Sequence, residues 1–124
     1  MQGKHVVVAE DESLIALYIV EMLERLGCTV IGPVARVADV IRAAQEVTPV
    51  DCAVLDINLR GQTVFAALPS LLDRGVTVLL ASGYSGNALM FPTEFRDLPC
   101  IVKPYDEDTL VRALKKAARD SPSH

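Results

Sequence analysis

The sequence is poor in the residues that build disulfide frameworks and metal–thiolate sites. Its 124 residues include three cysteines and two histidines, with no CxxC pair. His5 stands at the start of a predicted strand and His124 at the chain end, so we expect neither a zinc site nor a cysteine–histidine catalytic pair. The cysteines sit beside apolar residues, which predicts buried free thiols in a reducing cytoplasm: Cys28, Cys52 and Cys100.

Long apolar runs and an excess of positive charge are also absent. No window of about 18 residues lacks charged or turn residues, and no basic stretch precedes an apolar run at the start, so we expect neither a transmembrane helix nor a secretory signal. Twelve Lys and Arg against 16 Asp and Glu give a net charge of −4. A general nucleic-acid binder needs a basic face, so we expect no direct binding to nucleic acid, and none to membranes. One modest basic cluster fits the last turns of a helix: Arg112, Lys115, Lys116 and Arg119.

What is present is enough apolar material for one compact core. Hydrophobic residues make up 51% of the chain and charged residues 23%. This composition excludes intrinsic disorder, and the length fits one domain, which we expect to span residues 1–124.

Short apolar runs alternate with amphipathic stretches along the whole chain. The runs predict buried strands at residues 6–9, 29–31, 52–55, 76–81 and 100–102. Helical spacing predicts helices over 13–26, 37–47, 65–72 and 106–118, and a short or irregular helix within 83–98. Ser13 and Asp106 are expected N-caps, Gly27 and Gly75 expected helix stops, and Gly32-Pro33 the end of the second strand. Five such strand–helix units predict a doubly wound α/β fold with a parallel sheet covered on both faces.

Polar residues follow four of these strands, where sites in doubly wound sheets lie. Glu10, Asp11 and Glu12 follow the first strand, Asp56 and Asn58 the third, Ser82 and Gly83 the fourth, and Lys103 the fifth. In a flavodoxin-like strand order Asp11 and Asp56 would lie side by side and repel each other. A hard cation such as Mg²⁺, with Lys103 as a second cation, would offset this repulsion.

Two carboxylates, a metal, a lysine and a hydroxyl together favour phosphoryl transfer. Asp56 would attack phosphorus, while Mg²⁺, Lys103 and Ser82 would stabilise charge on the phosphoryl oxygens. Each piece alone has an ordinary explanation, as an acidic helix start, a turn aspartate or a Ser-Gly turn. Their joint placement at one edge of the sheet is what indicates a site.

Four segments make the chain resemble the response-regulator receiver family over essentially its whole length: VVVAEDES at 6–13, VLDINL at 54–59, LLASGY at 79–84 and IVKPYD at 101–106. The resemblance implies a flavodoxin-like (CheY-like) five-stranded sheet in the order 2-1-3-4-5, with five helices of which the fourth is irregular.

The resemblance also implies roles for the site residues. Asp56 would be the phosphoacceptor, and Glu10 and Asp11 would form the acidic pair for Mg²⁺, for which Mn²⁺ could substitute. Asn58 would complete the metal site with its backbone carbonyl. Ser82 and Lys103 would be the switch hydroxyl and the family's lysine, and together with Asn58 and Gly83 they would bind the phosphoryl group. The Lys103–Pro104 bond is expected to be cis.

The chain departs from this family where the switch residues lie. Receivers usually carry Tyr or Phe three residues before the lysine, and here that residue is Cys100. Tyr84 could take over part of its task, so the switch candidates are Ser82, Tyr84 and Cys100. The Ser-Gly-Tyr segment is similar to that of a subset of stand-alone receivers with an irregular fourth helix.

The resemblance implies a cytoplasmic phosphorelay protein that is not a turnover enzyme. A sensor histidine kinase or histidine phosphotransfer protein would donate the phosphoryl group, and an unknown downstream protein would respond to it. The protein would be a monomer or a weak homodimer.

Two alternatives stay open at this stage. One is a pseudo-receiver that binds a partner regardless of phosphate, which Cys100 alone favours. The other is an enzyme on the same architecture. A nucleotide or flavin enzyme would need a Gly-rich or Ser/Thr-rich loop where Glu10 and Asp11 stand, and an aspartate-based phosphatase would need Asp in place of Asn58.

Overall fold

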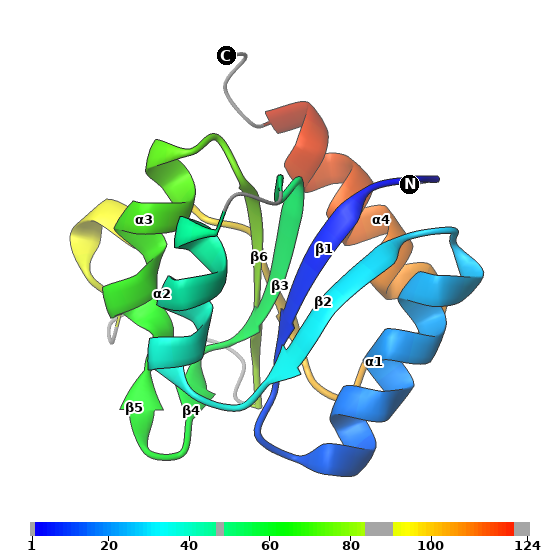
Figure 1. Ribbon diagram of the computed structural model, residues 1–124, viewed down its shortest axis with the longest axis horizontal. Coiled ribbons are helices and arrows are strands. Elements are labelled where there is room, and N and C mark those ends of the chain that lie inside the picture. The colour runs from blue at the N-terminus through cyan, green and yellow to red at the C-terminus, as the bar shows by residue number, and fades with distance from the viewer. Residues whose placement is uncertain (1, 47–48, 84–90, 121–124) are drawn as a thin grey trace.

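A five-stranded parallel sheet forms the centre of the protein in the computed structural model, which describes residues 2–46, 49–83 and 91–120. Its strands are β1 His5–Ala9, β2 Thr29–Val34, β3 Cys52–Asp56, β6 Thr77–Ser82 and β7 Cys100–Val102. They lie in the order β2-β1-β3-β6-β7, each parallel to its neighbours (Figure 1). This order confirms the predicted flavodoxin-like topology.

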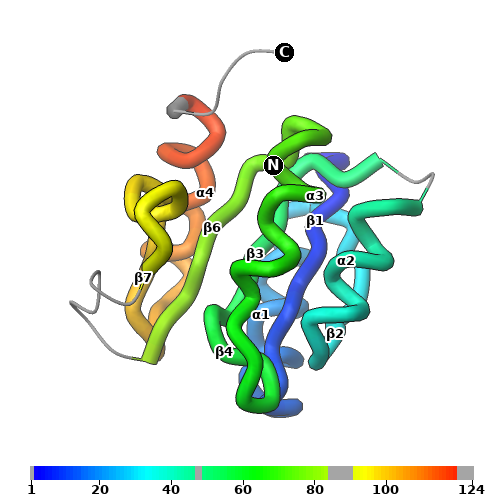
Figure 2. The backbone as a smooth tube through the Cα atoms, turned by 90° about the vertical axis from the view of Figure 1, so that its left-hand side faces the viewer, coloured from blue at the N-terminus to red at the C-terminus, as the bar shows by residue number. Residues whose placement is uncertain are grey.

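Helices cover both faces of the sheet. Helices α1 Ser13–Arg25 and α4 Glu107–Asp120 lie on one face, and α2 Val37–Gln45 and α3 Leu68–Asp73 on the other (Figures 1 and 2). A 3₁₀ turn, η1 Val64–Ala67, leads into α3. Side chains of β1 alternate between the two layers: Val7 and Ala9 pack toward α2 and α3, whereas Val6 and Val8 pack toward α1 and α4. Within the described residues no helix is both long and apolar enough to cross a membrane.

The helix ends agree in part with the sequence-based expectations. Gly27 has φ +84° and follows the end of α1, where its N–H donates to the Glu24 carbonyl at 3.0 Å. Asp106 caps α4 by accepting a hydrogen bond from the Thr109 N–H at 2.8 Å. The prediction that Ser13 is an N-cap was wrong, because Ser13 is already the first residue of α1 and Glu12 precedes it at the cap position.

Gly32-Pro33 does not end β2, contrary to expectation. Val7 and Ala9 of β1 pair with Ile31 and Val34, so β2 carries one extra residue in this interval and continues through it as a bulge. Gly32 has φ +106°, and a Cβ there would lie 2.8 Å from the Val34 nitrogen. Since β2 is an edge strand, it tolerates Pro33 and its cis peptide bond with Gly32.

A small hairpin between β3 and η1 was not predicted. It pairs β4 Asn58–Leu59 with β5 Gln62–Thr63 in antiparallel fashion, and Arg60 and Gly61 form its turn. In the region of the expected irregular helix the structure describes a 3₁₀ turn, η3 Thr93–Phe95, whose Phe95 stacks on Phe65 with ring centroids 6.0 Å apart. Residues 84–90 lie outside the described part of the chain.

Candidate functional site

The carboxyl ends of β1, β3 and β7 bring three of the predicted residues into direct contact. Lys103 Nζ lies 2.7 Å from Glu10 Oε1 and 3.0 Å from Asp56 Oδ2. Their side chains are largely buried, with exposed fractions of 15% for Lys103, 1% for Glu10 and 10% for Asp56. The sheet places these residues because Val7–Ala9 pair with Ala53–Leu55, which sets the ends of β1 and β3 side by side.

Burial and ion pairing shift the pKa values of Glu10 and Lys103 in opposite directions. Burial raises the pKa of Glu10 above its usual value, and the hydrogen bond from Lys103 offsets only part of this effect. Burial also lowers the pKa of Lys103, but its hydrogen bonds to Glu10 and Asp56 outweigh burial and leave that pKa above its usual value. Lys103 is therefore a permanent cation between two carboxylates.

Asp11 completes an acidic triad at the mouth of the site. One carboxylate oxygen from each of Glu10, Asp11 and Asp56 can be chosen so that all three lie within 4.8 Å of one another. Asp11 is only partly buried, and its Oδ2 accepts a hydrogen bond from the Arg60 N–H at 2.9 Å. This hydrogen bond holds the pKa of Asp11 below its usual value.

The hairpin leaves the Asn58 carbonyl available as a fourth oxygen. The Val64 N–H donates to the Ile57 carbonyl at 2.7 Å, which makes Ile57 and Val64 a hydrogen-bonded pair. Such pairs alternate in antiparallel ladders, so the next pair, Asn58 and Thr63, is a non-hydrogen-bonded one. Three carboxylates and a carbonyl are hard oxygen donors, and this donor set fits Mg²⁺ or Mn²⁺.

Ser82 and Gly83 lie at the end of β6, beside the start of the Lys103 segment. The Lys103 N–H donates to the Ser82 carbonyl at 2.8 Å, which ties these two strand ends together. A Cβ on Gly83 would meet no atom within 4 Å, so the space in front of its backbone is open. The expected cis bond between Lys103 and Pro104 is present.

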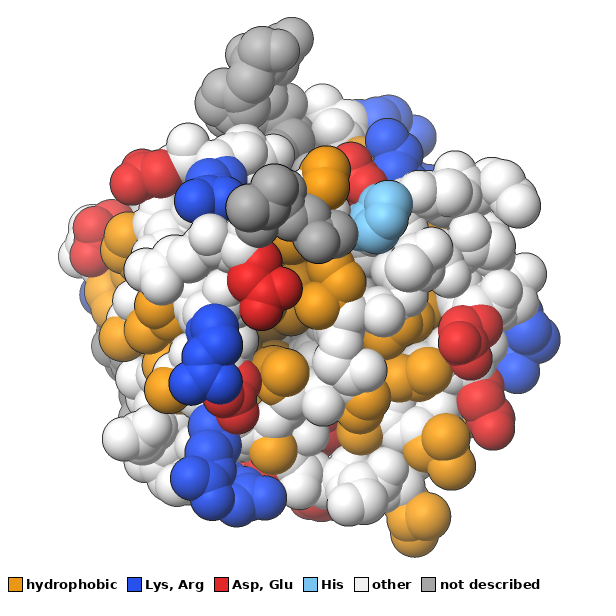
Figure 3. Space-filling view, viewed as in Figure 1, with side chains coloured by type: hydrophobic (Ala, Val, Ile, Leu, Met, Phe, Trp, Pro, Cys, Tyr) orange, Lys and Arg blue, Asp and Glu red, His pale blue; other side chains and the backbone are white. Residues whose placement is uncertain are grey.

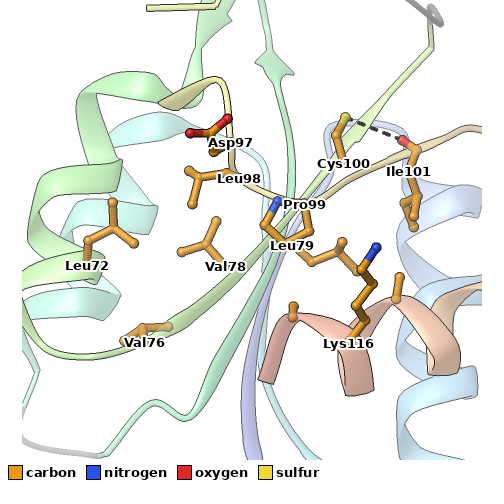
Figure 4. A pocket seen from close by; sticks show the side chains of 12 residues that line it. Leu72, Val76, Val78, Leu79, Asp97, Leu98, Pro99, Cys100, Ile101 and Lys116 are labelled. Carbon is orange, nitrogen blue, oxygen red and sulfur yellow. Dashed lines mark hydrogen bonds between the residues drawn. The ribbon is translucent and has the colours of Figure 1, made fainter. Parts of the chain in front are cut away.

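Of the two remaining switch candidates, the structure describes only Cys100, which it does not bring to the site. Tyr84 lies outside the described residues. Cys100 begins β7, at the far end of that strand from Lys103, and its Sγ lies 3.8 Å from the Ile101 carbonyl (Figure 4). Cys28 and Cys52 are buried as expected, but Cys100 is exposed, because it lies on the outer edge of the sheet. The prediction of a buried thiol at Cys100 was therefore wrong.

Cys100 also lines a cavity of about 490 Å³ at the amino ends of β6 and β7. Apolar side chains from both layers form most of its wall, including Leu72, Val78 and Leu79 (Figure 4). Lys116 and Asp97 are the charged residues of this lining. The cavity lies away from the acidic triad and does not contribute to it.

Two features near the site had little signal in the sequence. The Arg60 N–H is a backbone donor, and every residue type except proline has one, so its hydrogen bond to Asp11 could not be predicted from the residue type. Helix α1 also carries exposed apolar side chains: Leu14 is 83% exposed, Leu17 54% and Tyr18 46%, and Tyr18 lines a small cavity together with Lys103. Figure 3 shows hydrophobic side chains gathered over this helix at the lower right. Only the inward-facing stripe of α1 stands out by helical spacing.

Comparisons with solved structures agree with this fold. No family model matches the sequence, and a search of curated proteins finds no match. Among solved structures, SdrG from Sphingomonas melonis Fr1 is 31% identical, with a TM-score of 0.79 over 93% of this chain and 96% of SdrG. A BeF₃-activated conformation of SdrG, from Pseudomonas melonis Fr1, has a TM-score of 0.77 over 95% of this chain and 99% of that one.

A third structure supports the fold. The PhyR response regulator REC domain from Erythrobacter litoralis is 24% identical, with a TM-score of 0.81 over 100% of this chain and 96% of that domain. The 31% identity to SdrG over 93% of this chain shows the family as well as the fold. The chain belongs to the response-regulator receiver family.

Proposed function

We propose that the protein is a phosphoacceptor in a phosphorelay, with Asp56 as the residue that is phosphorylated. The observation that carries this proposal is the position of Asp56, which contacts the Lys103 ammonium at 3.0 Å and stands within the acidic triad. In this proposal the protein carries a signal and does not turn over a substrate. It would act in the cytoplasm as a single receiver domain.

The proposed reaction moves a phosphoryl group from a phosphohistidine to Asp56. A carboxylate oxygen of Asp56 forms the new bond to phosphorus as the bond from phosphorus to the histidine nitrogen breaks, and the electron pair of that bond returns to the imidazole. The charge on the transferred group faces the Lys103 ammonium and the open backbone at Gly83. Ser82 pairs with Val102, the residue before Lys103, and in this proposal its hydroxyl is a further donor to the phosphoryl group.

A divalent cation is the proposed cofactor, and Glu10, Asp11, Asp56 and the Asn58 carbonyl would hold it. When bound, it would neutralise the triad and help to bind the incoming phosphoryl oxygens. Lys103 offsets only one of the three carboxylate charges, so we expect the unphosphorylated protein to accept this cation readily.

The first prediction is that the protein gains one phosphoryl group from a small-molecule donor. Incubation with acetyl phosphate or phosphoramidate in the presence of Mg²⁺ should increase the intact mass by one phosphoryl group, and chelation of Mg²⁺ should prevent the increase. Intact mass spectrometry measures both. A folded protein that gains no mass under any of these conditions would be a pseudo-receiver, and the proposal would be wrong.

We place the docking of the phosphodonor protein on α1. Besides its exposed leucines, this helix contributes Ile15, Tyr18 and Ile19 to an apolar cavity of about 220 Å³ whose wall also includes Lys103 and Pro104. Exposed apolar surface that continues into the wall of a site favours contact with a partner protein. A phosphohistidine presented by that partner would then lie next to Asp56.

A negative charge introduced on α1 should slow phosphoryl transfer from a protein donor and leave transfer from a small-molecule donor unchanged. Leu17→Glu is expected to slow transfer from a phosphorylated histidine phosphotransfer protein by about tenfold or more, since buried anchors dominate interfaces. The rate of this variant with acetyl phosphate should stay unchanged, because Leu17 is 54% exposed on α1 and is not among the residues proposed to bind the cation or the phosphoryl group. The matched control is Gln45→Glu, which adds the same charge at an exposed position of α2, on the opposite face of the sheet. Equal slowing with both donors would contradict the docking surface.

A further inference from the structure

A chain of hydrogen bonds connects Asp56 to Asp11 through the β4–β5 hairpin. The Asn58 N–H donates to Asp56 Oδ1 at 3.4 Å, and the Gly61 N–H donates to the Asn58 side-chain oxygen at 3.0 Å. The Arg60 N–H then donates to Asp11 Oδ2 at 2.9 Å. The hairpin thus contacts two of the three carboxylates of the triad.

The turn of the hairpin has a backbone conformation that suits Gly61 but not Arg60. Arg60 has φ +51° and Gly61 φ +83°, and both values are positive, as a two-residue I′ hairpin turn requires. Glycine adopts this conformation without strain, but a residue with a Cβ disfavours it. The hydrogen bond from the Gly61 N–H to the Asn58 side chain lies within the hairpin and stabilises the turn with arginine at its first position.

Asp11 depends on this turn more than the other two carboxylates do. Lys103 forms ion pairs with Glu10 and Asp56, and the side chains of both carboxylates are at least nine-tenths buried. Asp11 is partly exposed, and the hydrogen bond that orients its Oδ2 comes from the Arg60 backbone. Without that donor only the weaker interactions with Glu10 and Lys103 would orient the Asp11 carboxylate, and rotamers that face solvent would become accessible.

We propose that the Asn58 side chain is a positioning residue for the cation site. By holding the Arg60–Gly61 turn, it keeps the Arg60 N–H against Asp11 and so orients the Asp11 carboxylate toward Glu10 and Asp56. Asn58 would then serve the site twice, through its carbonyl as a ligand and through its side chain as the support of another ligand. The inference rests on the proposed function, because it assumes that the triad binds a divalent cation.

The test compares two double variants that differ only in how well they adopt the turn. Asn58→Ala is expected to weaken Mg²⁺ binding by about tenfold, the size of effect that outer-shell partners of metal ligands have. Adding Arg60→Gly to Asn58→Ala introduces a residue that adopts positive φ without strain, and it keeps the backbone N–H donor. Adding Arg60→Ala removes the same charge without that preference. We expect the glycine double variant to bind Mg²⁺ about fivefold more tightly than the alanine double variant.

Binding is measured on the unphosphorylated protein by Mg²⁺ titration of its amide NMR spectrum. Equal affinities for the two double variants would overturn the inference, because the Asn58 side chain would then act directly and not through the turn. A wild type that binds no Mg²⁺ would overturn the proposed function, and this inference with it. The two failures are therefore distinguishable.

Hydrogen exchange of the Arg60 amide is a second measurement that needs no metal. In the metal-free wild type this amide should exchange slowly, and Asp11→Ala and Asn58→Ala should each accelerate it. Exchange as fast in the wild type as in Asp11→Ala would overturn the inference even if Mg²⁺ binding were normal, because Asp11 would not be held by the turn.

Discussion

Asp56→Asn is expected to reduce phosphoryl uptake by at least about 1,000-fold while leaving the fold intact. The amide lacks the anionic oxygen that attacks phosphorus, so the step loses its nucleophile. The same amide keeps the shape of the side chain. Its single oxygen can accept one of the two hydrogen bonds that the carboxylate accepts, which come from Lys103 at Oδ2 and from the Asn58 N–H at Oδ1. Intact mass after incubation with acetyl phosphate and Mg²⁺ measures the loss, and far-UV circular dichroism checks the fold.

The matched control for this variant is Asp73→Asn, at the exposed end of α3. It removes the same charge far from the triad and should take up the phosphoryl group like the wild type. If Asp56→Asn still gained the full mass, another side chain would be the acceptor. Peptide mapping after reduction of the acyl phosphate with borohydride would then identify that residue.

The strand ends were the most predictable part of the molecule. Short β-branched runs identified the strands of the sheet. Parallel strands place their carboxyl ends at the same edge of the sheet, and this does not depend on where the helices begin and end. This is why Glu10, Asp56 and Lys103 could be placed at one edge from the sequence. The sequence did not indicate which carboxylates pair with the lysine, and in the structure these are Glu10 at 2.7 Å and Asp56 at 3.0 Å. Family resemblance was needed for finer assignments, such as the carbonyl role of Asn58.

The parts that sequence reasoning missed depend on backbone geometry. Residues Asn58–Leu59 and Gln62–Thr63 form strands of two residues each, too short to show alternation, and Arg60-Gly61 is not among the usual hairpin turn pairs. Gly32-Pro33 has the composition of a strand end, but a bulge on an edge strand accommodates it. Cys100 has apolar neighbours in the sequence, yet the strand that contains it lies at the edge of the sheet, and strand order decides its exposure.

Lys103→Met is expected to lower the free energy of unfolding by about 3 kcal/mol at pH 8, because it leaves two buried carboxylates without their counter-charge. Glu10 and Asp56 expose only 1% and 10% of their side chains, so water cannot replace the lost ammonium. Lys115→Met, on the exposed side of α4, is the control and should change stability little. The chain has no tryptophan, so denaturant unfolding is followed by circular dichroism.

The pH dependence of this loss distinguishes electrostatics from lost packing. Burial already raises the pKa of Glu10 above 4.5, and removal of Lys103 would raise it further. A group with a raised pKa binds its proton more tightly in the folded state, so its contribution to stability is present below the unfolded pKa and is lost as pH rises through the folded pKa. The deficit of Lys103→Met should therefore be small near pH 4.5 and grow toward pH 8. In the wild type the pKa of Lys103 lies above 10.5, so its ion pairs should persist until the pH exceeds that value. A deficit that stayed constant from pH 4.5 to pH 8 would mean that Lys103 stabilises the fold by packing, and that its charge does not hold the two carboxylates together.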